Sequence, residues 1–266
     1  MRLEGKTVMI TGAASGFGKA LAEGCASYGC KLILLDKDAA SLAEVSRTLR
    51  ERGTSVTELR CDLSVGPDIQ NIPADSLKAA DVLVNNAGIG AQGSFVERPF
   101  EEFDLIARVN YLALAHLTKR YLEQRSLEIP SAIVNVSAIV GLIELPYMCA
   151  YSSSKFAVAA FSRCLRAELS GTKIHVMSVY PGPGHTNFGK AFGTQRSYDK
   201  PHHRFLILQP EQVANSIIRG LLGGKREIYI PSYLRLFVLF RNMFPSLYEY
   251  LICAVQRDRR LPPKSP

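Results

Sequence analysis

Short, almost continuously apolar runs alternate with longer helix-forming segments along most of this chain. Continuous apolar runs are typical of strands buried on both faces of a parallel sheet, and parallel strands need crossover connections that are usually helical. The alternation therefore predicts an α/β fold with a doubly wound parallel sheet, in which ligands bind at the carboxyl ends of the strands. The expected strands cover residues 6–11, 31–35, 55–60, 81–85, 132–137 and 173–180.

Two of the connecting segments depart from a regular helical pattern. A glycine and two prolines interrupt residues 64–80, so a shortened or irregular crossover helix is expected there. Asn110 lies in the middle of the helical stretch 100–124, where an asparagine is locally unfavourable. It is either tolerated on a polar face or bends the helix to place its amide usefully. The other expected helices cover residues 19–28, 39–52 and 152–169.

Residues with useful chemistry gather where the expected strands end. The run Gly12-Ala-Ala-Ser-Gly16-Phe-Gly18 joins the first strand to the first helix. Its glycines permit a tight turn and close backbone approach, and the amides at the helix start attract the pyrophosphate of a dinucleotide, although loop punctuation alone gives similar runs. The shared location is stronger evidence for a site than any one motif. The other strand ends carry Asp36, Asp62, Asn86, Ser137 and Pro181-Gly182.

Asp36 bears on the choice of cofactor. An acidic side chain at the end of the second strand accepts hydrogen bonds from the adenosine ribose hydroxyls and repels a 2′-phosphate, which favours NAD over NADP. Ser15 supplies no basic side chain to attract that phosphate, whereas Lys37 could pair with it if Asp36 turned away. A strand-end aspartate that caps the next helix is an equal alternative.

Tyr151 and Lys155 are four residues apart in a segment rich in helix formers, so they share one face of the expected helix. A free phenol loses its proton at about pH 10 and is a poor acid or base at neutral pH unless a neighbouring cation stabilises the phenolate. Lys155 is placed to be that cation. Taken alone, a tyrosine and a lysine at this spacing are more often an exposed packing pair than a functional one.

Composition narrows the class of protein. The 266 residues are 47% apolar and 21% charged with no low-complexity run, which is typical of one soluble globular domain. The net charge of +8 is spread along the chain without an RNA-type motif, so no nucleic-acid partner is expected. The cysteines form no C-x-x-C pair and the histidines lack ligand spacing, which predicts reduced thiols in a cytoplasmic protein and no metal site. The first residues show no charged segment followed by an apolar run, so no secretory signal is expected.

In its ordered motifs the sequence resembles the short-chain dehydrogenase/reductase family in its short, single-domain form, over roughly residues 5–230. Residues 11–18 resemble the family's T-G-x-x-x-G-x-G loop, with Phe17 in place of the usual aliphatic residue. Residues 85–88 resemble its N-N-A-G motif, and Pro181-Gly182 with Thr186 resembles its P-G-x-x-x-T element. The residues that match the family's catalytic tetrad are Asn110, Ser137, Tyr151 and Lys155.

The resemblance implies a Rossmann-type catalytic domain over residues 1–230 that transfers a hydride between a nicotinamide cofactor and a secondary alcohol or ketone. Ser137 would bind the substrate oxygen, Tyr151 would exchange a proton with it, and Lys155 would lower the pKa of the phenol and hold the nicotinamide ribose. Asn110 would position a water that links Lys155 to solvent. The implied cofactor contacts are Gly12, Ser15, Gly16, Phe17, Gly18, Asp36, Asp62, Leu63, Asn86, Ala87, Gly88, Tyr151, Lys155, Pro181, Gly182 and Thr186.

Two other functions stay open on the same fold: a dinucleotide-binding sensor or scaffold without catalysis, and an epimerase or dehydratase without net redox change. Residues 183–209 are expected to form a substrate lid with an apolar lining, which favours a lipid- or steroid-like substrate, although a solvated loop would look the same. Apolar residues around much of the expected helices 100–124 and 152–169 predict a homodimer or homotetramer.

Residues 231–266 lie beyond the resemblance and are expected to form an apolar helical appendage. Residues 234–244 are rich in Leu and Phe, and after Pro245 a capping box at Ser246 and Glu249 is expected to start a second helix. Six Lys/Arg against two Asp/Glu give this tail a net charge of +4, and no apolar run in it approaches the ~20 residues that cross a bilayer. Docking on a membrane surface, on another subunit or on the substrate cleft is expected.

Overall fold

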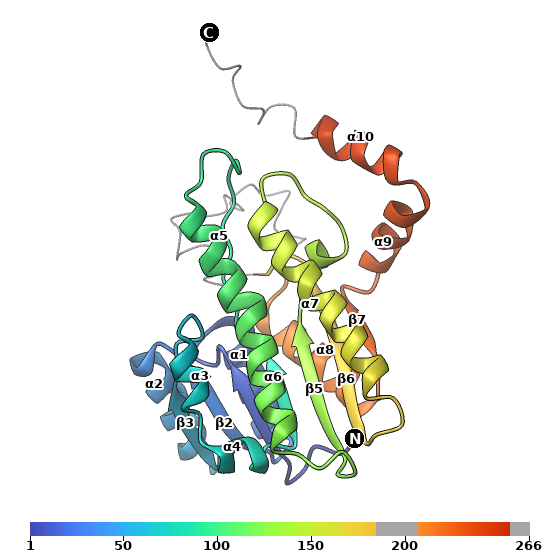
Figure 1. The fold of residues 1–266 in the computed structure, drawn as a ribbon. Coiled ribbons are helices and arrows are strands. Elements are labelled where there is room, and N and C mark those ends of the chain that lie inside the picture. The colour runs from blue at the N-terminus through green and yellow to red at the C-terminus, as the bar shows by residue number, and fades with distance from the viewer. Residues whose placement is uncertain (185–206, 256–266) are drawn as a thin grey trace.

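Within residues 1–184 and 207–255, which the computed structural model describes, seven parallel strands form one sheet (Figure 1). The strand order is β3-β2-β1-β4-β5-β6-β7, so the chain reverses direction across the sheet between β1 and β4. Such a switch point leaves a crevice at the carboxyl ends of the strands. The predicted doubly wound sheet is confirmed. Its strands are β1 Thr7–Thr11, β2 Lys31–Asp36, β3 Val56–Arg60, β4 Val82–Asn85, β5 Ser131–Val136, β6 Ile174–Pro181 and β7 Glu227–Ile230.

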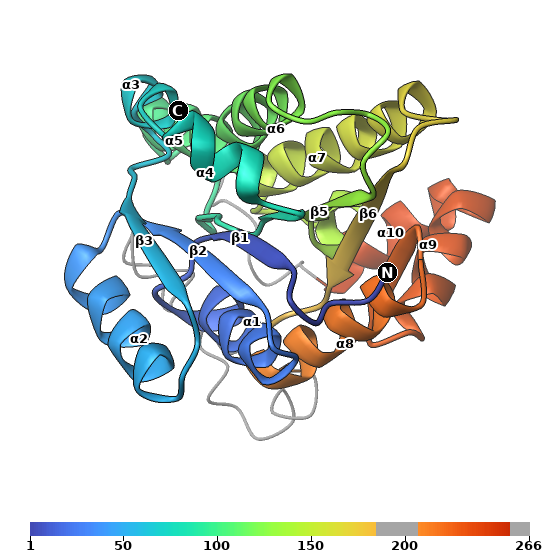
Figure 2. The same ribbon diagram turned by 90° about the horizontal axis from the view of Figure 1, so that it is seen from below.

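Helices cover both faces of the sheet, as the view along it shows (Figure 2). One layer contains α1 Gly16–Ser27, α2 Ala39–Glu51 and α8 Pro210–Leu222, and the other contains α3 Gly66–Gln70, α4 Ala74–Ala79, α5 Phe100–Ala107, α6 Ala113–Glu123 and α7 Cys149–Glu168. The short pair α3 and α4 confirms the irregular crossover predicted for residues 64–80. The sequence pattern assigns no elements to residues 210–230, where α8 and β7 form, although the capping box of Gln209 and Gln212 with Pro210 is a helix start signal.

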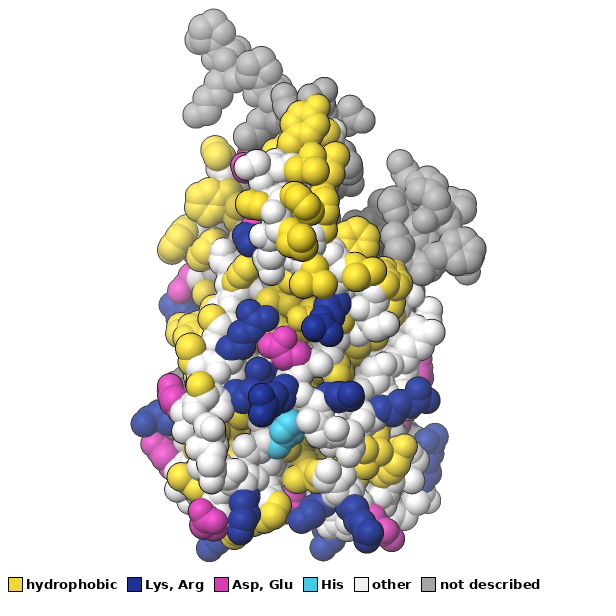
Figure 3. Space-filling model, turned by 90° about the vertical axis from the view of Figure 1, so that its right-hand side faces the viewer, with side chains coloured by type: hydrophobic (Ala, Val, Ile, Leu, Met, Phe, Trp, Pro, Cys, Tyr) yellow, Lys and Arg dark blue, Asp and Glu magenta, His cyan; other side chains and the backbone are white. Residues whose placement is uncertain are grey.

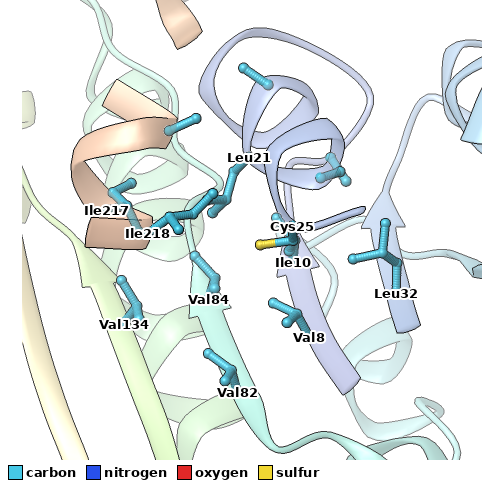
Figure 4. Close-up of a cluster of buried hydrophobic side chains, with 14 of the residues drawn as sticks. Val8, Ile10, Leu21, Cys25, Leu32, Val82, Val84, Val134, Ile217 and Ile218 are labelled. Carbon is cyan, nitrogen blue, oxygen red and sulfur yellow. The ribbon is translucent and has the colours of Figure 1, made fainter. Parts of the chain in front are cut away.

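The core follows from the alternation of side chains along each strand. Val8 and Ile10 of β1 face the layer of α1 and α8, whereas Met9 between them belongs to the cluster on the opposite face. Figure 4 shows how Leu21 of α1 and Ile218 of α8 fill the space above the central strands. Each buried side chain of this size stabilises the fold by about 2 kcal/mol. Because side chains pack on both faces of the central strands, the ends of these strands, which border the crevice, are fixed in position.

The long helix predicted for residues 100–124 contains a π-helical turn, Arg108–Leu112, between α5 and α6. The wider turn lies at Asn110, whose side chain is buried. Local π turns of this kind are frequent at functional sites because they redirect single side chains. Of the two alternatives for Asn110, the distorted helix is therefore the one observed.

The tail forms two helices, α9 Leu234–Met243 and α10 Pro245–Val255, at the end of the molecule where the strands end (Figure 1). The predicted capping box is wrong, because α10 begins at Pro245 and includes Ser246; the fixed φ of proline suits the first turn of a helix. No helix among the described residues is long and apolar enough to span a membrane. Thr186, most of the expected lid and the basic residues beyond 255 lie outside the described residues.

Candidate active site

The glycine loop between β1 and α1 leaves no room for side chains at two of its glycines. Gly12 and Gly16 have φ of +68° and +53°, a left-handed conformation that favours glycine. A Cβ on Gly18 would lie 2.0 Å from the carbonyl oxygen of Gly12, and one on Gly12 would lie 2.9 Å from the Cα of Ala87. Ser15 is the N-cap residue of α1, and its hydroxyl makes no capping hydrogen bond. The loop and the helix start thus form the cradle that a pyrophosphate requires.

Thr11 joins this loop to the segment after β4. Its hydroxyl oxygen accepts hydrogen bonds from the backbone amides of Asn86 and Ala87, both at 3.0 Å. The side-chain amide of Asn86 donates in return to the carbonyl of Thr11 at 2.9 Å. The predicted N-N-A-G segment therefore lies against the glycine loop at the switch point. Thr11 is absent from the site residues that the sequence predicts, although it directly precedes Gly12.

The Asp36 carboxylate holds the glycine loop from the neighbouring strand. One oxygen accepts the backbone amide of Ala14 and the other that of Asp38, both at 3.0 Å. The helix-capping alternative for Asp36 is wrong, because the carboxylate that caps α2 is that of Asp38, which accepts the amide of Ser41 at 3.1 Å. Asp36 is therefore fixed at the edge of the cradle.

Asp62 follows β3 at the next strand end. Burial raises the pKa of its carboxyl, but hydrogen bonds from the amide and hydroxyl of Ser64 and the charges of Lys37 and Arg60 lower it overall. Asp62 thus carries a negative charge at neutral pH, and Lys37 is close enough to interact with it. Leu63 is partly buried against the core.

The Asn110 amide connects three elements. Its oxygen accepts the backbone amide of Ile89 at 2.8 Å, and its nitrogen donates to the carbonyl of Ile89 and to the hydroxyl of Ser154, both at 2.9 Å. The π turn, the loop after β4 and α7 are therefore locked together. Ser154 is absent from the predicted site residues, and its only sequence signal is its position beside Lys155.

Ser137, Tyr151 and Lys155 come together where β5 meets α7. Tyr151 is 9% exposed, Lys155 3% and Ser137 2%, so the alternative of an exposed packing pair is wrong. The Ser137 hydroxyl donates to the carbonyl of Lys155 at 2.8 Å, and the Lys155 ammonium donates to the carbonyl of Val136 at 2.9 Å. The ammonium nitrogen lies 5.8 Å from the centre of the Tyr151 ring. The cation is thus held next to the phenol, as the spacing predicts.

Burial lowers the pKa of Lys155 from 10.5 to about 8. The folded-state pKa is below that of the unfolded chain, so the buried cation destabilises the folded protein below about pH 8, and this penalty disappears as the pH rises from about 8 towards 10.5. Lys155→Met is therefore expected to raise the free energy of unfolding at pH 7 by about 2 kcal/mol, since each pKa unit corresponds to ~1.4 kcal/mol and the lost hydrogen bond offsets part of the gain.

Urea unfolding of the wild type and Lys155→Met at pH 7 and at about pH 10 checks this expectation. The stability difference should shrink at the higher pH, because the wild-type lysine is then largely neutral in the folded state. A difference that stays the same at both pH values would show that Lys155 is not the group that titrates.

Tyr151 also belongs to an apolar cluster that the tail completes. The loop after β5 supplies Ile143 and Met148, and the tail supplies Val238 of α9 and Tyr248 of α10. The tail is fastened to this loop at Glu144, whose carboxylate pairs with Arg241 and whose carbonyl accepts the hydroxyl of Tyr248 at 2.7 Å. The inner face of the two tail helices therefore packs against the chain's own candidate site, beside Tyr151.

The fold and the loop geometry define a Rossmann-type dinucleotide-binding protein, and comparison with known proteins specifies the family. A short chain dehydrogenase family model matches residues 6–197. The chain is 32% identical over 263 residues to a dehydrogenase/reductase SDR family protein 7-like of Anopheles gambiae, covering 94% of this chain and 83% of that protein. This protein belongs to the short-chain dehydrogenase/reductase family.

Solved structures agree with this assignment. A short-chain dehydrogenase/reductase from Burkholderia phymatum in complex with NAD superposes with a TM-score of 0.82 at 26% identity, covering 100% of this chain and 99% of the other. A short-chain dehydrogenase from Sphingobium yanoikuyae in complex with NADPH gives a TM-score of 0.78 at 25% identity, covering 98% of each chain. The protein is thus an oxidoreductase of a family that uses nicotinamide dinucleotides, and the choice between the two dinucleotides is not fixed by family membership.

Proposed function

We propose that the protein interconverts a secondary alcohol and a ketone with a nicotinamide dinucleotide, with Ser137, Tyr151 and Lys155 as its catalytic residues. The observation that carries the proposal is the burial of all three side chains together at the carboxyl end of the sheet. The glycine cradle fits a dinucleotide because its turn is tight enough to expose backbone amides to a pyrophosphate. Only glycine allows this turn at positions 12 and 18, where a Cβ would collide with neighbouring backbone atoms. When bound, the cofactor supplies or accepts the hydride.

The remaining chemistry falls to side chains of this chain. The Ser137 hydroxyl would orient the substrate oxygen. The Tyr151 hydroxyl would give that oxygen a proton during reduction, and the Tyr151 phenolate would take the proton back from the alcohol during oxidation. The nearby Lys155 cation favours the phenolate that remains after proton donation. Asn110 would hold the loop after β4 and the helix α7 in fixed positions relative to each other. The water relay that the family resemblance implies would start from Lys155.

An apolar substrate is favoured by the surroundings of Tyr151. Ile143, Met148, Val238 and Tyr248 belong to the same apolar cluster as the phenol, so a hydrophobic substrate that contacts this cluster would remove its own apolar surface from water. A steroid, a retinoid or a long-chain acyl alcohol meets this requirement, whereas a sugar would leave polar groups without partners.

A substrate panel tests the proposal. Steroid, retinoid, acyl-chain and sugar alcohols are incubated with NAD or NADP, and reduced cofactor is followed by its absorbance. Net production of reduced cofactor with an apolar secondary alcohol, at a kcat/KM about 100-fold or more above that for sugars, is expected, since several buried apolar groups each contribute ~1 kcal/mol. Faster turnover of sugars, or conversion without net reduction of the cofactor, would contradict it.

The preferred cofactor is proposed to be NAD(H), with tighter binding of NADH than of NADPH in a calorimetric titration. The fixed Asp36 carboxylate at the edge of the cradle repels a 2′-phosphate, and the charge of nearby Lys37 also acts on Asp62, whose carboxyl pKa it lowers. Asp36→Ser is expected to weaken NADH binding about tenfold and to reduce the difference in affinity between NADH and NADPH. Asp75→Ser, at an exposed carboxylate in α4, is the matched control and should change neither affinity.

Tighter binding of NADPH by the wild type would overturn the preference. Lys37 would then be the group that pairs with the 2′-phosphate, and Lys37→Ser should weaken NADPH binding selectively.

A further inference from the structure

The helices α9 and α10 each have two apolar faces, of which the fold uses one. The inner face packs on the cluster around Tyr151 through Val238 and Tyr248, with Leu234, Phe240 and Ile252 partly buried beside them. The outer face remains in solvent. It carries Leu236, Phe237, Leu239, Met243, Phe244, Leu247, Tyr250 and Leu251, which are between 44% and 69% exposed.

An apolar face of this extent is unusual for a protein in water, because exposed apolar patches above a few hundred Å² usually mark interaction sites. Hydrophobic side chains gather over α9 and α10 at the upper end of the molecule, whereas most of the Lys, Arg, Asp and Glu side chains on this face lie on the part below, among other side chains (Figure 3). Exposed polar residues share one side of each helix, Arg235 and Asn242 seven residues apart on α9 and Ser246 and Glu249 three residues apart on α10. An apolar face beside a polar stripe is the pattern of a helix that lies in an interface.

A second apolar patch lies at the same end of the molecule. Phe95, Val96 and Phe100 are 59%, 70% and 68% exposed, just before and at the start of α5. The rings of Phe95 and Phe100 pack against Phe103 with centroids 6.0 and 5.7 Å away, so the patch is a fixed feature. In Figure 1 α5 and the tail helices stand on opposite sides of the upper end, toward which the strands point.

The charge of the tail favours a lipid partner over a second protein copy. Arg235 is exposed on α9, and the sequence after Val255 holds four basic residues and one acidic residue. Anionic headgroups attract such basic residues by about 1 kcal/mol each. A fluid surface also accommodates two separate patches without matching their shapes, whereas a second copy would have to be complementary to both.

We propose that the outer face of α9 and α10, together with the patch at Phe95, Val96 and Phe100, docks on the surface of a membrane that contains anionic lipids. The carboxyl ends of the strands, where Ser137, Tyr151 and Lys155 lie, would then be at the end of the molecule that meets the lipid. This inference depends only on the exposed surface, so it can fail while the proposed reaction stands.

Flotation with vesicles tests the docking surface. The full-length protein is mixed with vesicles of phosphatidylcholine with or without phosphatidylserine and centrifuged through a density gradient. The wild type is expected to float with the anionic vesicles and less at high salt. Leu236→Ser/Met243→Ser/Tyr250→Ser should reduce the floating fraction about tenfold or more, since it removes three apolar groups that would enter the lipid. Phe95→Ser/Val96→Ser should reduce it as well.

Leu127→Ser/Ile129→Ser/Leu222→Ser is the matched control, because these residues are 38% to 49% exposed outside both patches. It should float like the wild type, and NADH affinity shows that each variant is folded. The proposal is overturned if the wild type stays in the dense layer, or if the outer-face variant floats like the control. A dimer in light scattering that dissociates in the outer-face variant, without flotation of the wild type, would instead assign the face to a second copy.

Discussion

Tyr151→Phe is expected to lower kcat about 1000-fold while NADH still binds within about twofold of the wild-type affinity, because the change removes the hydroxyl that exchanges the proton and little volume. The phenylalanine ring retains the packing of Tyr151 in its apolar cluster. Lys155 keeps its hydrogen bond to the carbonyl of Val136, so the position of its ammonium group should be unchanged. Steady-state kinetics with a competent alcohol and calorimetric titration with NADH measure the two quantities.

Two further variants make the result specific. Tyr28→Phe removes the same atom from a 44% exposed phenol and should leave kcat and affinity unchanged. Lys155→Ala should damage both turnover and cofactor binding, because its cation is proposed to serve both. If Tyr151→Phe retains about a tenth or more of the wild-type kcat, another group moves the proton and the catalytic assignment is wrong.

Most of the sheet could be predicted from the sequence because its strands are buried on both faces. β2 is a continuous apolar run whose residues face two different clusters, Leu32 and Leu34 on one side and Ile33 and Leu35 on the other. A buried strand of this kind leaves an unmistakable pattern. β7 has only four residues at the edge of the sheet, one of them fully buried, so its pattern is too weak to separate it from a loop.

The positions of the site residues could also be predicted, but many of their contacts could not. Strand ends and helix spacing bring Ser137, Tyr151 and Lys155 together. The pairing of Asn110 with Ile89 depends on a π turn, and no local sequence pattern specifies where a helix will widen. The Asp36 carboxylate reaches the amide of Ala14, 22 residues earlier, and only the packed loop reveals that bond.

The tail shows the limit of helical periodicity. Its sequence predicts helices that are apolar around most of their circumference, but not which side the protein itself covers. That side is selected by contacts far apart in the chain, such as the ion pair of Arg241 with Glu144, 97 residues away. The outer face is then left over as the surface proposed for lipid.

Gly18→Ala is expected to weaken NADH binding about 100-fold or more and to lower the free energy of unfolding by about 2 kcal/mol, the usual cost of overpacking a tight site. Its Cβ would lie 2.0 Å from the carbonyl oxygen of Gly12 and 2.7 Å from the side-chain nitrogen of Asn86. Both distances are far below the ~3.5 Å at which heavy atoms normally pack. The backbone of the loop must move, and displacement of its amides removes the cradle for the pyrophosphate.

Gly66→Ala is the matched control for this change, because a Cβ on Gly66 at the start of α3 meets no atom within 4 Å. It should leave NADH affinity unchanged and raise stability by about 0.5 kcal/mol, since alanine restricts the unfolded chain. Calorimetric titration and urea unfolding of both variants give the two quantities independently. NADH affinity within about threefold of the wild type in a folded Gly18→Ala protein would mean that the loop can move without losing the cofactor, and the glycine cradle would not be the pyrophosphate site.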